Sequence, residues 1–544
     1  MADNTARREF LRLAGKGAAT GMLLPGLAAA QSGPAQATAA QSASRDGKPL
    51  RIPPAVWNVR ASDAAGDGKT IDTPAINSLI ERAAHGGGGL IWFPPGIYAC
   101  YSIHLRSNVA LYLDAGAVIL AADAPPSGGY DHPESNQPWE AYQDFGHNHW
   151  HNSLIWGEDL QNISITGPGR IWGRGLSKGR GSGPDANTPG VANKAIALKN
   201  CRSVILRDFQ ILQGGHFGIL ATGVNNLTID NLTIDTNRDG MDIDCCRNVR
   251  ISNCTVNSPW DDGICLKSSY ALGRAVLTED VTVSNCFVTA GYELGSVLDG
   301  TFRRFPDGTP VARQGRIKLG TESAGGFRNI AISNCVLDGC KGLALETVDG
   351  GLLEEVAISN ITLRSITDTP LFLRLGRRMR APQGSSIGTL NRVLIDNIVS
   401  YDCASPLPVM IMGVPDHPVA DIRINNLYLH HRPAAPASQA SAAPPEQQTL
   451  YPEANRFGPM PSQGFFIRHA RNITIANTEI ACASADGRPF FALADVNDID
   501  LFRVRMRAPE PAPRFLLQDV RELRISACRG MADQNISWVK NRVI

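Results

Sequence analysis

The chain has 544 residues, with 52 lysines and arginines against 51 aspartates and glutamates, which gives a net charge of +1. This balance removes the broad electrostatic argument for nucleic acid or an anionic membrane surface as a partner. The length allows several ordinary domains, or one long solenoid that grows by stacking repeats.

The first thirty residues are expected to be an export signal outside the fold. Arg7 and Arg8 precede the mostly apolar stretch 13–27, and the alanines at 28–30 fit a cleavage site. Paired arginines are typical of twin-arginine signals, although an ordinary secretory signal can also contain them. Both signals predict a periplasmic or secreted protein. No later run is long and apolar enough to predict a membrane span.

Residues 31–50 are rich in Ala, Ser, Gln and Gly and are predicted to form a disordered linker. Order is expected from residue 51. A short helix is predicted with Thr73 as its N-cap and Pro74 at its first position, ending before the glycines at 86–89. Short β-rich runs punctuated by Gly, Pro and Asn follow it.

A short phrase recurs along the chain from residue 161. Its variants include QNISITG at 161, NNLTIDN at 225, RNVRISN at 247, RNIAISN at 328 and RNITIAN at 471. Most begin with a polar turn, continue with alternating β-branched residues and end with Asn, at a closest spacing of about 23 residues. The pattern predicts stacked β-solenoid coils, with alternate side chains in the lumen and the recurring Asn in a turn.

Three cysteines occupy the same position of this phrase. Cys254, Cys286 and Cys335 each follow Ser-Asn, and equivalent positions stack in a solenoid. The chain has few cysteines for its length, so we expect a ladder of small buried side chains and neither a disulfide scaffold nor a metal site.

Four long intervals between repeats predict inserted loops near 125–151, 296–315, 376–388 and 432–464. The first loop is rich in Tyr, His and Trp, which suits stacking on sugar rings. The last loop is rich in Pro and Ala and is expected to be a flexible excursion without a site.

Three carboxylates are expected to share one patch of the solenoid. Asp239 precedes Asp261 and Asp262 by about one repeat, so it should lie over that pair. Close carboxylates raise one another's proton affinity, which suits acid/base catalysis. Any one of them alone would more often be a structural turn residue beside glycine. Their combination at coil spacing favours catalysis.

Two cations, Arg316 and Lys318, lie at positions i and i+2 and therefore on one face of a strand. Such a pair is commonly a solvated face. With the N-x-D of Asn237–Asp239 and the D-D pair, however, this R-I-K resembles the signature of glycoside hydrolase family 28, the polygalacturonase family. C-R-N-V at 246–249 and D-D-x-I-x-x-K-S at 261–268 also resemble its bacterial members.

The resemblance implies a fold and a set of roles. The fold would be all-β, a single-stranded right-handed parallel β-helix of the pectin-lyase-like kind over residues 51–544, with a short N-terminal capping helix. Asp261 would be the general acid, while Asp239 and Asp262 would hold and deprotonate the attacking water. Arg316 and Lys318 would bind the carboxylate of a galacturonate-like sugar. No cofactor or metal is implied, and we expect a monomer.

An inverting mechanism adds a geometric expectation. Hydrolysis through an oxocarbenium-like transition state needs one protonated and one ionised carboxyl, and inversion needs room for water between them. The carboxyls of Asp239 and Asp261 should then be roughly 6.5 to 9.5 Å apart.

The chain also departs from the family pattern. Where the pattern has G-H-G, this sequence has Gly-Tyr292-Glu293, and tyrosine does not carry the charge of an imidazolium at neutral pH. Tyr292 and Glu293 remain candidate sugar contacts together with Asn237, and His216 is a candidate replacement for the missing histidine. Arg238 adds a cation inside N-x-D.

Three functions remain open at this point. The first is an exported glycoside hydrolase acting on an acidic, pectin-type polysaccharide or its oligosaccharides. The second is a calcium-dependent polysaccharide lyase, with Arg238 or Arg316 as base and carboxylate ligands from Asp239, Asp242, Asp261 and Asp262. The third is a non-catalytic carbohydrate-binding solenoid.

Overall fold

The computed structural model of the protein describes residues 56–136, 138–142, 147–178 and 188–544. The predicted export signal and linker lie outside these ranges. Within them, no helix combines the length and the apolar character that crossing a membrane would require.

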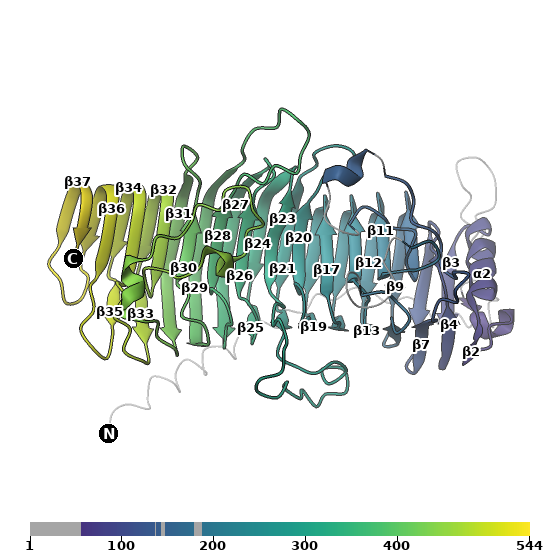
Figure 1. Cartoon of the computed structure of the whole chain (residues 1–544). Coiled ribbons are helices and arrows are strands. Elements are labelled where there is room, and N and C mark those ends of the chain that lie inside the picture. The colour runs from purple at the N-terminus through teal and green to yellow at the C-terminus, as the bar shows by residue number, and fades with distance from the viewer. Residues whose placement is uncertain (1–55, 137, 143–146, 179–187) are drawn as a thin grey trace, which may run out of the picture. The chain divides into compact units, whose positions relative to one another are not determined.

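Short parallel strands stack coil upon coil along the described chain, with α2 at one end and β37 at the other (Figure 1). The strands form three ladders, and each strand pairs with the strand at the same position of the next coil. Apolar side chains fill the lumen between the ladders. The long parallel stack is that of a right-handed β-helix, as predicted.

The ladder that carries the site contains β5 (Ile103–His104), β8 (Ile155–Glu158), β11 (Lys194–Lys199), β14 (Phe217–Thr222), β17 (Asp239–Asp244), β20 (Ile264–Ser268), β23 (Ile317–Ser323), β26 (Leu343–Thr347), β28 (Leu371–Leu375), β30 (Val409–Met412), β32 (Phe465–Ala476), β34 (Phe491–Phe502) and β36 (Phe515–Ser526).

The second ladder contains β1 (Val56–Asn58), β3 (Gly89–Phe93), β6 (Val109–Leu113), β9 (Gln161–Thr166), β12 (Arg202–Arg207), β15 (Asn225–Asp230), β18 (Arg247–Ser252), β21 (Thr278–Ser284), β24 (Gly326–Ser333), β27 (Leu352–Arg364), β29 (Thr389–Cys403) and β31 (Val419–His431).

The third ladder contains β2 (Asp67–Ile71), β4 (Gly96–Cys100), β7 (Ala117–Ala121), β10 (Arg170–Trp172), β13 (Gln210–Leu212), β16 (Thr233–Asp235), β19 (Thr255–Asn257), β22 (Phe287–Thr289) and β25 (Val336–Asp338), and further on β33 (Glu479–Cys482) and β35 (Arg505–Arg507). The final strand β37 (Gln534–Val543) pairs antiparallel with β36.

The N-terminal helix α2 (Thr73–His85) caps the first coils and buries an apolar stripe that includes Ile76 and Ile80. The prediction of its N-cap is wrong by one residue, because Asp72 occupies that position. The hydroxyl of Thr73 instead accepts a hydrogen bond from the backbone N–H of Tyr101 at 2.7 Å. The described residues also include four 3-10 helices: η1 (Val59–Ser62), η2 (Trp139–Tyr142), η3 (Ala437–Ser441) and η4 (Ala454–Phe457).

The recurring asparagines turn the chain between two ladders. Asn253, Asn285 and Asn334 have φ angles of 58°, 56° and 55°, in the left-handed region that asparagine tolerates. The amide of Asn360 donates to Asn334 Oδ1 at 3.0 Å, one coil away. The predicted turn role of this residue is confirmed.

The predicted cysteine ladder is also confirmed. Cys254, Cys286 and Cys335 are buried, and the thiol of each donates to the carbonyl two residues before it. All twelve cysteines are free and buried.

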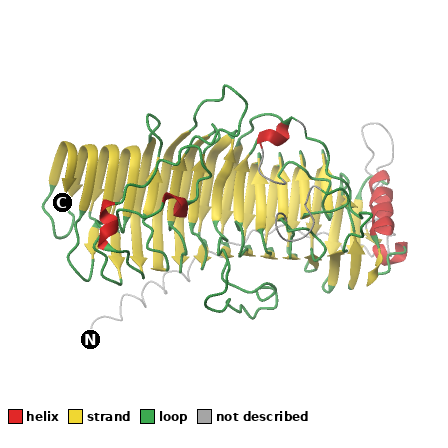
Figure 2. Cartoon of the chain, viewed as in Figure 1, coloured by secondary structure: helices red, strands yellow, loops and turns green. Residues whose placement is uncertain are grey.

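The four predicted loops lie between strands, and Figure 2 shows long loops leaving the stack of strands. They connect β7 to β8, β22 to β23, β28 to β29, and β31 to β32. Each of these loops begins or ends at a strand of the ladder that carries the site.

Candidate active site

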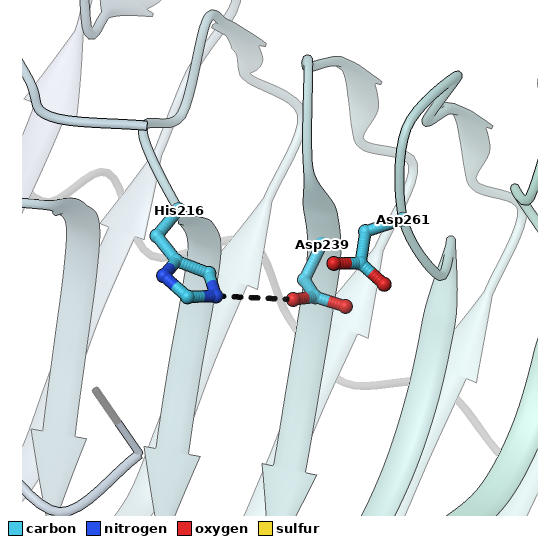
Figure 3. Close-up of side chains that lie close together, drawn as sticks. All are labelled: His216, Asp239 and Asp261. Atoms are coloured by element: carbon cyan, nitrogen blue, oxygen red, sulfur yellow. Dashed lines mark ion pairs between the residues drawn. The ribbon is translucent and has the colours of Figure 1, made fainter. Parts of the chain in front are cut away.

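Three aspartates meet on adjacent coils, as predicted. Asp239 begins β17, while Asp261 and Asp262 lie in the turn before β20. The backbone N–H of Gly240 donates to the carbonyl of Asp262 at 2.9 Å, which sets Asp239 level with the pair. Figure 3 shows Asp239 and Asp261 side by side on their two coils, with His216 one coil earlier.

The spacing of Asp239 and Asp261 differs from the expectation for inversion. One oxygen of each carboxyl and one ring nitrogen of His216 all lie within 4.8 Å of one another. The predicted separation of roughly 6.5 to 9.5 Å is therefore wrong for these nearest oxygens. The cause is the fold, because neighbouring strands lie about 4.8 Å apart and residues level with one another inherit that spacing.

Burial and mutual repulsion favour protonation of this close pair. Asp239 is 4% exposed, and burial raises its pKa well above the usual range, with a further increase from the charge of Asp261. Burial also raises the pKa of Asp261, and the charge of Asp262 adds to this effect. The two carboxyls therefore titrate as a unit that readily holds a proton.

Asp262 has the opposite character. Arg316 Nε lies 2.7 Å from its Oδ1, and Lys318 Nζ lies 3.2 Å from its Oδ2. Burial alone would raise the pKa of Asp262, but these two cations outweigh it and hold the pKa below its usual value. The site thus combines one ionised carboxylate with a pair that holds a proton.

Two hollows meet at the aspartates. The inner chamber encloses about 210 Å³ and is lined by His147, His216, Arg238, Asp239, Asp261, Asp262, Lys267 and Tyr451. The outer cleft encloses about 450 Å³ and is lined by Lys178, Asn237, Arg238, Trp260, Asp261, Leu294 and Gln314. Asp261 and Arg238 line both, and Arg238 Nη2 lies 2.5 Å from Asp261 Oδ2. A sugar chain that crosses between the hollows must pass Asp261.

Two of the predicted sugar contacts lie at these hollows. Asn237 lines the outer cleft, and His216 lines the inner chamber. The ring of His216 stacks on Phe217 with centroids 4.1 Å apart, and His216 Nε2 lies 3.8 Å from Asp239 Oδ2.

Tyr292 and Glu293 lie at neither hollow. The hydroxyl of Tyr292 is 3.2 Å from Asp338 Oδ2, and Glu293 pairs with Arg303 at 3.1 Å. The segment turns away because its backbone is held elsewhere: the N–H of Gly295 donates to an aspartate of β16 at 2.7 Å. The structure therefore does not bring the residues that replace G-H-G to the aspartates.

Arg316 and Lys318 point at Asp262 and not into a hollow. They are 2% and 0% exposed, so neither reaches a sugar carboxylate in this conformation. Tyr451 and Glu453 cover them: Lys318 Nζ lies 3.1 Å from the Tyr451 hydroxyl, and Arg316 Nη2 lies 2.9 Å from Glu453 Oε1.

The prediction that the 432–464 loop carries no site is therefore wrong, because both covering residues belong to it. The Pro- and Ala-rich composition of this loop gave no indication that the fold brings Tyr451 and Glu453 close to the aspartates. Glu346 is fully buried, and its Oε2 lies 3.7 Å from Lys318 Nζ.

The sequence assigned no individual role to several residues of the site, although His147 belongs to the loop expected to stack on sugars and Lys267 to the D-D-x-I-x-x-K-S motif. His147 Nε2 lies 2.8 Å from Asp242 Oδ2, and Lys267 Nζ lies 3.7 Å from the same atom, so both extend the polar wall of the inner chamber. Trp260 is 38% exposed beside the outer cleft. Its position directly before the D-D pair was an available signal, whereas nothing in the sequence marked Tyr451.

One group of described residues has the donor atoms for a metal ion: His216, Asp239 and Asp261. Arg238 already pairs with Asp261, and two further cations engage Asp262. Calcium prefers six to eight oxygen ligands. The donors left here do not fit that requirement.

Comparison with known proteins finds relatives among pectin-related sequences. The family model described as rhamnogalacturonase A/epimerase, pectate lyase-like, matches residues 56–291. A probable polygalacturonase of Vitis vinifera is 24% identical over 319 residues, which are 55% of this chain and 59% of that relative. The chain thus spans less than two thirds of the curated relative.

Solved structures show the same fold. The family 28 exopolygalacturonase of Yersinia enterocolitica has a TM-score of 0.60 and 17% identity, covering 84% of this chain and 82% of its own. The hyperthermoactive exopolygalacturonase of Thermotoga maritima has a TM-score of 0.52 and 15% identity, covering 91% and 96%. The chain is therefore a pectate-lyase-like right-handed β-helix protein that is similar to polygalacturonases.

Proposed function

We propose that this protein is a glycoside hydrolase that cleaves a pectin-type, galacturonate-containing polysaccharide or oligosaccharide. The observation that carries the proposal is the pairing of a proton-holding carboxyl pair with an ionised Asp262 at the junction of two hollows. Glycoside hydrolysis needs one protonated and one ionised carboxyl at the scissile bond. The similarity to polygalacturonases supports the substrate class.

We propose Asp261 as the general acid. It lines both hollows, so its proton reaches a glycosidic oxygen that lies between them. When the shared proton resides on Asp261, Asp239 is ionised and can work with Asp262 on a water in the inner chamber. After cleavage the departing sugar takes the proton of Asp261, and the water proton returns to the carboxylates.

Inversion rests on the resemblance to family 28, since the spacing of the nearest oxygens does not support it. Proton NMR of the first product tests this point. We expect a product with the anomeric configuration opposite to that of the cleaved bond. A first product with retained configuration would show instead that a carboxylate attacks the sugar directly.

The titration of Asp261 gives a pH prediction. Arg238 favours the ionised form of Asp261 and so opposes the increase of its pKa by burial. Arg238→Met removes this cation, so the pKa of Asp261 rises and the alkaline limb of kcat/KM moves about one unit to higher pH. Arg250→Met, an exposed change on the neighbouring coil, is the control. An unmoved limb would show that Asp261 is not the titrating acid.

Neither arginine that the sequence offers as base suits the lyase alternative. Arg316 and Arg238 are both ion-paired, and the neighbouring carboxylates raise the pKa of each against the effect of burial. A guanidinium with a raised pKa does not give up its proton to act as a base. We expect activity to survive EDTA and the products to contain no unsaturated, ultraviolet-absorbing sugar. Activity lost with EDTA and restored by calcium would favour the lyase.

We also propose that the protein acts outside the cytoplasm, on the basis of the expected twin-arginine signal. Fractionation of cells that express the full chain and an Arg7→Lys/Arg8→Lys variant tests this. The variant should remain in the cytoplasm. Equal export of both forms would leave an ordinary secretory signal as the explanation.

A further inference from the structure

Glu453, from the 432–464 loop, lies behind Asp262, which lines the inner chamber, and is connected to it through Arg316. Arg316 Nη2 donates to Glu453 Oε1 at 2.9 Å, and Lys341 Nζ donates to Glu453 Oε2 at 2.8 Å. Both oxygens therefore have a cationic partner, which is the arrangement that recognition of an anionic sugar requires. We call the space between Arg316 and Lys341 the carboxylate seat.

Glu453 is held in this seat as an anion. Burial would raise its pKa, but Arg316 and Lys341 outweigh burial and bring the pKa to about 2. At any pH from weakly acidic to neutral, Glu453 is therefore ionised. A uronate that enters the seat has to displace a carboxylate that already has both partners.

The other cations near the aspartates are also paired with protein carboxylates. Lys318 contacts Asp262, Arg238 contacts Asp261, and Lys267 lies 3.5 Å from Glu322 Oε2. The walls of the inner chamber carry two cations, Arg238 and Lys267, and three aspartates. A sugar carboxylate bound in this chamber would add a negative charge beside these aspartates. Both cations that line the chamber are already paired with protein carboxylates.

The outer cleft has the opposite balance. Lys178 and Arg238 line it together with the single carboxylate of Asp261. A chain bound across both hollows would therefore meet a neutral or acidic wall inside and a more cationic wall outside.

We propose that Glu453 is a specificity-determining residue: it holds Arg316 and Lys341 behind Asp262, so no unpaired cation among the described residues serves a sugar carboxylate at the inner chamber and the sugar unit bound there is uncharged. The unit is a neutral sugar or an esterified uronate, within a chain that carries free uronates elsewhere. This inference rests on the proposed hydrolase function and identifies the class of sugar at its inner subsite. Tyr451, on the same loop, forms part of the wall that such a sugar contacts.

The first test compares polygalacturonate with its methyl ester, in which a methyl group on each carboxyl removes the negative charge. Wild type should cleave the ester at least about tenfold faster, because the free acid adds a buried like charge. Glu453→Ala empties the seat and should reduce this preference about tenfold or more. Glu453→Gln keeps the volume and removes the charge, so its preference should be intermediate. Glu446→Ala, on the same loop but paired with Arg468 and His469, should behave as wild type.

The second test does not depend on catalysis. Galacturonate added to Glu453→Ala should raise its melting temperature by filling the empty seat, whereas wild type should not respond and galactose should not distinguish the two proteins. Absence of cleavage by wild type would contradict the proposed hydrolase, and this test would still decide the role of Glu453.

Three results would overturn the inference. They are a wild type that prefers polygalacturonate, variants at Glu453 that keep the wild-type preference, and a galacturonate response in wild type equal to that of Glu453→Ala. Each would show either that Glu453 leaves the seat when substrate binds, or that a sugar carboxylate does not enter the seat even when Glu453 is absent.

Discussion

Asp261→Asn should reduce kcat by about 10²- to 10⁴-fold on any chain that the wild type cleaves, with the fold intact. The variant keeps the volume of Asp261 and its place between the two hollows but has no proton to donate to the leaving oxygen. Burial raises the pKa of Asp261 and so disfavours its ionised form in the folded protein. Replacing this carboxyl by a neutral amide should therefore leave the fold intact. Reducing-end release and circular dichroism together measure this outcome.

The control for this experiment is Asp498→Asn, an exposed change on a distant coil. It should retain wild-type activity. Full activity in Asp261→Asn would show that another group protonates the leaving sugar, with Asp239 as the first candidate because its pKa is also raised.

Among the variants proposed for this site, Asp262→Asn should be the least stable, with a decrease of about 3–5 kcal/mol in the free energy of unfolding. The reason is that Asp262 pairs with Arg316 and Lys318, which are almost completely buried. Without this carboxylate their charges are left partly uncompensated. Urea unfolding at neutral pH measures the difference.

The pH dependence of this effect has a definite sign. The pKa of Asp262 is depressed in the folded protein, so its contribution is present above its unfolded pKa of about 4 and is lost as the pH falls. The gap between wild type and Asp262→Asn should therefore narrow on acidification. The double variant Asp262→Asn/Lys318→Met should recover part of the loss, since it removes one unpaired cation. A single variant as stable as wild type would contradict the buried network.

The sequence predicted the solenoid because its signal is periodic and local. The alternation of β-branched residues, the asparagine at each turn and the Ser-Asn-Cys phrase recur at coil spacing, and each coil obeys the same rule. Stacking then placed Asp239 level with Asp262 without any knowledge of the loops. The N-cap of α2 was misplaced because the hydroxyl of Thr73 bonds to Tyr101, between β4 and β5, and such a distant partner is not visible in the local sequence.

The walls of the site were predicted less well because loops build them. Tyr451 and Glu453 lie more than a hundred residues from the cations that they contact, in a segment whose composition suggests no structure. Tyr292 was placed at the site by its position in a motif, yet its loop folds onto β16 and β25. Long-range contacts of this kind have no periodic signature.

The most direct test of the central claim is digestion in water enriched in heavy oxygen, followed by mass spectrometry of the new chain ends. Wild type should act on polygalacturonate, its methyl ester or rhamnogalacturonan and place one heavy oxygen in the new reducing end, because hydrolysis consumes one water. Asp261→Asn should give little product of any kind. A product that contains a double bond and no heavy oxygen would contradict the account, because elimination would then have broken the bond.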